Sequence, residues 1–81
     1  MDPKAALAAA LQGAAASRFA YNNWIKKGGF PATLKVRVHT DTWMRGIRSI
    51  EVHRVGLQYV YGVHPMSKTK VRLPFAAVEV E

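Results

Sequence analysis

Six consecutive residues near the middle of the chain decide its fold: Leu34, Lys35, Val36, Arg37, Val38 and His39. Apolar and basic side chains alternate along this stretch. Successive side chains of a β-strand point to opposite faces, so an alternating pattern indicates a strand with one buried face. We therefore expect a strand whose apolar side chains enter the core and whose basic side chains face the solvent.

Two further strands are predicted downstream, over residues 47–54 and 57–63. Ile47 is out of phase with the apolar positions that follow it, which predicts a β-bulge near residues 48–49. In the later strand the bulky side chains occupy alternate positions. We therefore expect four of them to point into the core: Leu57, Tyr59, Tyr61 and Val63.

A short fourth strand is predicted over residues 70–73, followed by one irregular turn over residues 74–77 and a brief last strand from Val78. The strand-rich body thus covers about residues 33–81. Five short strands joined mostly by tight turns must curl to cover a common core. The pattern predicts a strongly bent, five-stranded antiparallel sheet or a small barrel.

Upstream of the strands, residues 3–24 are typical of a single alanine-rich helix. Asp2 is a good N-cap, and the proline after it fits the first helical position. Phe19 and Trp24 are expected to tie this helix to the sheet. A helix followed by an antiparallel sheet is an α+β fold, and a chain of this length is expected to form one domain, residues 1–81.

The helix carries no charge between Lys4 and Arg18, whereas a surface helix normally carries charges on its wet face. Small residues also recur in it at four-residue spacing, which lets two helices approach closely. We interpret five of them as a packing face for a second copy or a protein partner: Ala6, Ala10, Gly13, Ala14 and Ser17. The alternative is an alanine-rich helix that simply packs one face on its own sheet.

Positive charge is concentrated in the strand-rich part of the chain. The 81 residues carry a net charge of +7, and residues 18–72 hold 11 Lys and Arg against only Asp41 and Glu51, a net +9. Such a field attracts polyanions: RNA, DNA, an anionic membrane surface or an acidic protein. The alternative is a charge that serves only solubility.

Basic residues at alternate strand positions must point away from the core, so a curled sheet gathers them on its outer surface. Trp43, which lies in a turn beside Arg45, is the best candidate for stacking on a base, although it could equally cap the end of a barrel. Each basic residue could also be a plain solvent-facing residue. Ten candidates for contact with nucleic acid follow: Lys35, Arg37, His39, Trp43, Arg45, Arg48, Arg54, Lys68, Lys70 and Arg72.

The layout of a helix and five short strands resembles the SH3-like and Sm/Hfq-like small barrels. The segment from Leu34 to Val80 is similar to that pattern in spacing. The resemblance implies rings of subunits that bind RNA. The chain reads HRVGLQ at residues 53–58, where the Sm/Hfq family carries its Asp-x-x-Met-Asn element, and VRLPF at residues 71–75, in place of the final motif. The resemblance is therefore architectural and transfers no site residue.

Catalytic and metal-binding patterns are absent from the sequence. Only two carboxylates lie in the body, and there is no phosphate-binding glycine loop or nucleophile motif. The three histidines, His39, His53 and His64, show no metal-ligand spacing, and the chain has no cysteine. We expect no enzyme activity, no cofactor, no metal and no small-molecule substrate.

Two binding functions remain open. The first is a nucleic-acid-binding module, RNA ahead of DNA, that uses the basic sheet surface and acts as an oligomer. The second is a protein-interaction or assembly module, or a small regulator, that uses the alanine-rich helix. No run approaches the ~18 apolar residues of a membrane span, and the lack of cysteine gives no support for secretion. We expect a cytoplasmic protein.

Overall fold

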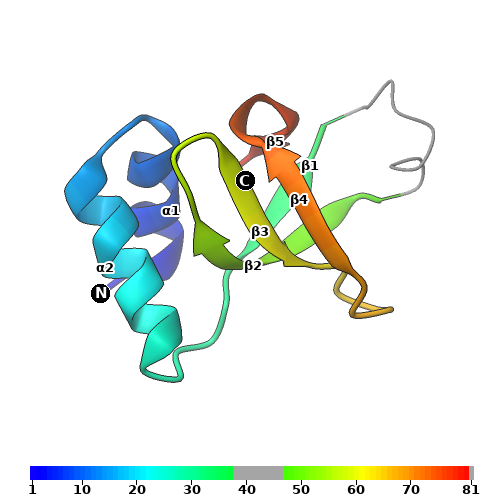
Figure 1. The fold of residues 1–81 in the computed structure, drawn as a ribbon, viewed down its shortest axis with the longest axis horizontal. Helices are drawn as coiled ribbons and strands as arrows, with labels where there is room; N and C mark the ends of the chain where they lie inside the picture. The colour runs from blue at the N-terminus through cyan, green and yellow to red at the C-terminus, as the bar shows by residue number, and fades with distance from the viewer. Residues whose placement is uncertain (38–46, 81) are drawn as a thin grey trace.

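The structure is a computed structural model that describes residues 1–37 and 47–80. It has an α+β fold in which a pair of helices precedes a five-stranded antiparallel sheet (Figure 1). The elements follow one another in the order α1 (Pro3–Leu11), α2 (Ala15–Lys26), β1 (Thr33–Val36), β2 (Ser49–Val55), β3 (Tyr59–Val63), β4 (Lys70–Pro74), the single turn η2 (Phe75–Ala77) and β5 (Val78–Glu79).

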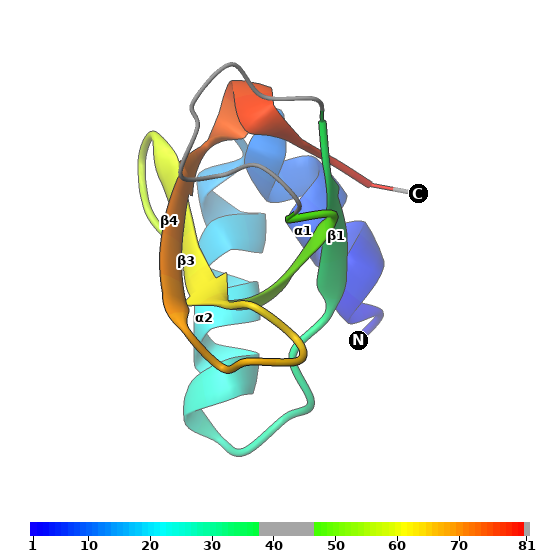
Figure 2. The same cartoon turned by 90° about the vertical axis from the view of Figure 1, so that its right-hand side faces the viewer.

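The alanine-rich segment forms two helices, so the prediction of one helix over residues 3–24 is wrong. Asp2 caps α1 as expected, since its carboxylate accepts from the Lys4 backbone N–H at 3.0 Å. The break lies at Gly13, whose φ of +96° belongs to the left-handed region that glycine adopts without a Cβ clash. This turn lets α1 fold back beside α2 (Figures 1 and 2).

The sheet has the strand order β4-β3-β2-β1-β5 and is strongly bent. Among the described strands, β4 and β5 each have one neighbour, so the sheet is open and is not closed into a barrel. The η2 turn carries the chain across one end of the bent sheet, from β4 at one edge to β5 beside β1 (Figure 2). Of the two expected forms, the bent sheet is the one observed.

One hydrophobic core joins the helices to the inner face of the sheet. Helix α1 contributes Ala6, Leu7 and Ala10, and α2 contributes Tyr21. The strands supply the remaining buried apolar side chains: Leu34, Val36, Ile50, Val52, Val55, Val60, Val71, Leu73 and Val78, with Ala77 from η2.

Neither helix of the described chain is long and apolar enough to cross a membrane.

Strand β3 has the opposite phase to the one predicted. Val60 and Gly62 are buried, whereas Tyr59 and Tyr61 are half-buried on the other face and Leu57, in the turn before the strand, is 78% exposed. The reason lies at Gly62: a Cβ atom there would overlap the backbone carbonyl of Glu51 on β2. Only glycine permits this close approach of the two strands, and it fixes which side chains of β3 face outward.

Strand β2 contains a bulge in its C-terminal half, not near residues 48–49 as predicted. Val52 pairs with Gly62 and Arg54 pairs with Tyr61, so His53 is the extra residue. Both His53 and Arg54 are exposed, while the flanking Val52 and Val55 are buried. The bulge therefore places two consecutive polar side chains on the outer surface.

In its first half, β2 forms backbone hydrogen bonds with β1. Around the bulge and beyond it, the backbone of β2 forms hydrogen bonds with side chains of α2 instead. The Tyr21 hydroxyl donates to the Val52 carbonyl at 2.6 Å and accepts from the Ala32 N–H at 2.9 Å. The Asn22 side-chain amide donates to the Val55 carbonyl at 2.9 Å and accepts from the Val55 N–H at 2.8 Å. These bonds satisfy backbone groups that would otherwise lack partners in a partly buried place.

Burial raises the pKa of the Tyr21 hydroxyl above its ordinary value of 10.0, the hydrogen bond from Ala32 lowers it in part, and the charge of Glu51 raises it further. The hydroxyl therefore stays protonated and remains a donor to the Val52 carbonyl at neutral pH.

We predict that Tyr21→Phe lowers the free energy of unfolding by about 1–3 kcal/mol, because it leaves two backbone groups without a partner. Urea denaturation followed by circular dichroism measures the change. Tyr59→Phe is the matched control, since the Tyr59 hydroxyl has no hydrogen bond within the described part of the chain. Equal stability of the two variants would contradict the prediction.

Candidate functional site

The outer face of the sheet carries a row of side chains that crosses three strands. Arg54 on β2 lies opposite Tyr61 on β3, and Tyr61 lies opposite Arg72 on β4. Tyr59 lies on β3 as well, two residues before Tyr61 and on the same face. We refer to these four residues, Arg54, Tyr59, Tyr61 and Arg72, as the Arg–Tyr cluster.

Each arginine of the Arg–Tyr cluster stacks on a tyrosine ring. The Cζ atom of Arg54 lies 4.1 Å from the ring centroid of Tyr61, and that of Arg72 lies 4.8 Å from the centroid of Tyr59. The two ring centroids are 6.5 Å apart, with their planes tilted by 55°. A guanidinium keeps its charge and its five N–H donors when it lies over an aromatic ring, so it can still attract an anionic ligand.

Within the described residues, each acidic side chain binds partners that lie outside this cluster. Glu79 on β5 forms ion pairs with Lys35 at 3.8 Å and Arg37 at 3.4 Å. Glu51 on β2 binds Lys68 at 3.3 Å and His53 at 3.2 Å. The third carboxylate of residues 1–37 and 47–80, that of Asp2, caps α1. The positive charge of the Arg–Tyr cluster is therefore not paired within the described chain.

Glu51 contacts both a lysine and a histidine. Its partial burial would by itself raise its pKa, but hydrogen bonds to Lys68 and His53, and the positive charge of these groups, outweigh that effect and lower the pKa below the ordinary value of 4.5. The carboxylate thus holds the β3–β4 connection, which contains Lys68, against β2.

The ten residues predicted to contact nucleic acid separate into groups. Arg54 and Arg72 meet in the Arg–Tyr cluster, and Lys70 lines a hollow of about 450 Å³ together with Tyr61 and Arg72. Arg48 is exposed just before β2. The ion-paired group consists of Lys35, Arg37 and Lys68. Three residues lie outside the described part of the chain: His39, Trp43 and Arg45.

The small residues predicted to form an intermolecular packing face are also divided. Ala6 and Ala10 are buried in the core of this chain. Gly13 and Ala14 are exposed at the break between α1 and α2, and Ser17 is half-buried in the first turns of α2. The five residues therefore do not form one continuous helix face.

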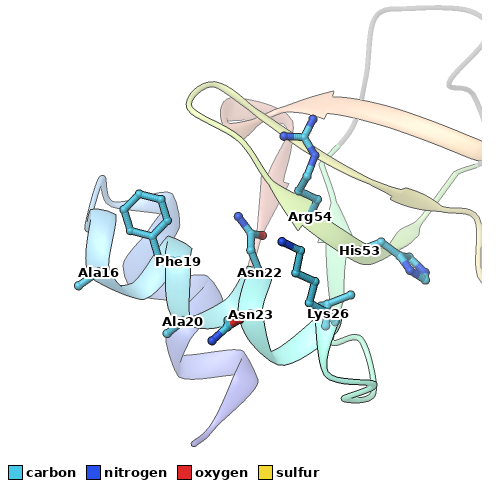
Figure 3. A pocket seen from close by; sticks show the side chains of 9 residues that line it. Ala16, Phe19, Ala20, Asn22, Asn23, Lys26, His53 and Arg54 are labelled. Carbon is cyan, nitrogen blue, oxygen red and sulfur yellow. The ribbon is translucent and has the colours of Figure 1, made fainter.

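Beside the sheet, a second hollow of about 650 Å³ lies between α2 and β2. Figure 3 shows Lys26 of α2 and Arg54 and His53 of β2 at this border, with Phe19 farther along the helix. Phe19 is 63% exposed and does not tie the helix to the sheet, whereas Trp24 packs against the core. The Cζ atom of Arg18 lies 4.8 Å from the Phe19 ring centroid.

The two tyrosines of the cluster are absent from the predicted site, because the alternation of bulky residues assigned them to the core. The signal that identifies them is Gly62. A glycine inside a strand often marks a point where two backbones approach closely. Gly62 lies at such a point, on the buried face of β3, so its neighbour Tyr61 lies on the outer face.

We predict that the stability of the protein falls more steeply on acidification than that of a Glu51→Gln variant. A carboxylate with a lowered pKa stabilises the fold above its ordinary pKa of 4.5, and the contribution disappears as the pH falls through the lowered value. Thermal denaturation at a series of pH values from neutral to strongly acidic measures the difference. Parallel curves for the two proteins would show that the Glu51 interactions contribute nothing.

Comparison of the chain with protein-family models, with curated proteins and with solved structures yields no match. The similarity in layout to the SH3-like and Sm/Hfq-like barrels thus remains an expectation from the sequence. The outer face is therefore interpreted from the geometry of its own residues alone.

Proposed function

We propose that this protein is a non-enzymatic module that binds single-stranded nucleic acid through the outer face of β2, β3 and β4. The observation that carries the proposal is the Arg–Tyr cluster, in which two guanidinium groups and two aromatic rings alternate on an exposed sheet surface. Flat rings that accept bases and cations that accept phosphates are the two elements that single-strand binders combine.

The geometry of the cluster favours a single strand over a duplex. Tyr59 and Tyr61 are half-buried on the outer face of the sheet, so each side chain is held by the sheet and remains partly exposed to solvent. Unpaired bases can stack on such rings, whereas the bases of a duplex are already stacked on one another. RNA is placed ahead of DNA on the resemblance in layout to the Sm/Hfq-like barrels alone.

The positive charge near the Arg–Tyr cluster supports the assignment of nucleic acid to this face of the sheet. Lys70 and Arg72 occupy exposed positions of β4, and Tyr61 of β3 lies between Arg72 and Arg54 of β2. The net charge of +7 would also attract a polyanion from a distance and speed its association. A cytoplasmic location, expected from the sequence alone, is part of this proposal.

We predict that affinity for a single-stranded homopolymer falls with salt, and that Arg54→Gln combined with Arg72→Gln flattens this dependence. The slope of log affinity against log salt should decrease by about 0.7 for each phosphate that the variant no longer neutralises. Fluorescence anisotropy titrations of labelled poly(U) at several salt concentrations measure it.

The matched control removes the same charge from Lys35 and Arg37, both of which are paired with Glu79. This Lys35→Gln, Arg37→Gln variant should keep most of the affinity. If the two double variants lose affinity equally, the charge of the molecule matters but the Arg–Tyr cluster does not.

We further predict that Tyr61→Leu weakens binding of a single strand by about 5-fold to 150-fold, the effect of removing one stacked base. Tyr61→Phe keeps the ring and should bind nearly as well as the unchanged protein. The same titrations with a duplex of equal length should show weaker binding and little difference between the variants. Equal affinity of the Leu and Phe variants for the single strand would refute stacking at this position.

A further inference from the structure

A third hollow, of about 610 Å³, lies between α2 and the turn that joins β2 to β3. It is lined by Arg18 and Phe19 of the helix, by Leu57 of the turn, and by Arg54 and Tyr61 of the Arg–Tyr cluster. Phe19 and Leu57 are two of the most exposed large apolar side chains of the described chain, at 63% and 78%. Exposed apolar side chains that line one hollow together indicate a binding surface.

The chemistry of this hollow repeats that of the sheet face. Arg18 stacks on Phe19 as Arg54 stacks on Tyr61 and Arg72 on Tyr59, and these are the three arginine–aromatic stacks in the described chain. None of the described residues that line the hollow carries a carboxylate. The neighbouring hollow along α2 adds the ammonium group of Lys26.

The hollow is also continuous with the sheet face. Arg54 lines it, lines the adjoining hollow along α2, and belongs to the Arg–Tyr cluster. A strand that crosses from β4 to β2 covers about 10 Å, two strand spacings, and arrives at this arginine. The next binding groups on its path are those of α2.

We propose that this hollow is a second nucleotide subsite, which takes the continuation of the strand bound on the sheet. A base packs against Phe19 and Leu57, and the neighbouring phosphate is held between the guanidinium groups of Arg18 and Arg54. This inference rests on the proposed function. The other occupant with matching chemistry, an acidic peptide with apolar side chains, is less favoured because the hollow shares Arg54 and Tyr61 with the face assigned to nucleic acid.

The test compares Phe19→Ala with Phe30→Ala. Both remove an exposed aromatic ring, but Phe30, 87% exposed in the connection from α2 to β1, lines none of the three hollows. Alanine is the best helix former, so the Phe19 variant should fold. The probe is labelled oligouridylate of about 12 nucleotides, within the range of about 4–16 that small single-strand-binding folds cover.

Phe19→Ala should weaken oligouridylate binding about 5-fold or more, and Phe30→Ala should leave it unchanged. Arg18→Gln should weaken binding more than the same change at Lys27, an exposed residue at the C-cap of α2 that does not line the hollow. Amide chemical shifts of Phe19 and Leu57 should move when the oligonucleotide is added.

If Tyr61→Leu weakens binding while Phe19→Ala behaves like Phe30→Ala, the subsite is refuted and the function of the sheet face stands. If neither variant loses affinity, the proposed function fails as well. A peptide in which glutamate and leucine alternate serves as the acidic polypeptide probe. Loss of its binding in Phe19→Ala, with oligouridylate binding intact, would assign the hollow to a protein partner and overturn the subsite.

Discussion

The hydroxyl group of Tyr21 occupies the point where the two halves of this molecule meet. It bridges the Val52 carbonyl and the Ala32 amide, while the neighbouring Asn22 pairs with both backbone groups of Val55. Together they let β2 leave β1, bulge at His53 and continue beside β3 with its backbone satisfied. The bulge in turn sets Arg54 opposite Tyr61, so the outer face of the sheet depends on a contact made on its inner side.

Local sequence patterns predicted the helices and strands better than the breaks and contacts between them. The N-cap at Asp2 and the alternation in β4 are decided by neighbouring residues and are confirmed, as is the alternation of the first strand over residues 34–37, the part that the structure describes. The break at Gly13 was hidden because one glycine costs a helix only about 1 kcal/mol, and alanine on both sides continues the helical pattern. The choice between one helix and two is made by packing α1 against α2 and the core, a contact that the sequence does not display.

In the candidate site, too, some features follow from the local sequence pattern and others depend on how the strands pair. That basic residues of β4 face outward follows from alternation alone, and Arg72 lies there. Which lysines and arginines are neutralised depends on register: Lys35 meets Glu79 only because β5 pairs with β1. The tyrosines were assigned to the wrong face because bulk was taken as the sign of burial, whereas the close contact of β3 with β2 at Gly62 decides the phase.

Helix α2 does for the second half of β2 what a neighbouring strand would do, with two side chains in place of a backbone. The boundary between the helical and strand-rich parts, near residue 30, is therefore no place to divide the chain. Residues 33–80 alone would present the bare edge of β2 beyond Glu51, and an exposed edge pairs readily with another chain. Helix α2 thus covers an edge of β2 that would otherwise be open to strand-to-strand pairing, and the hydrophobic core is shared between the helices and the sheet.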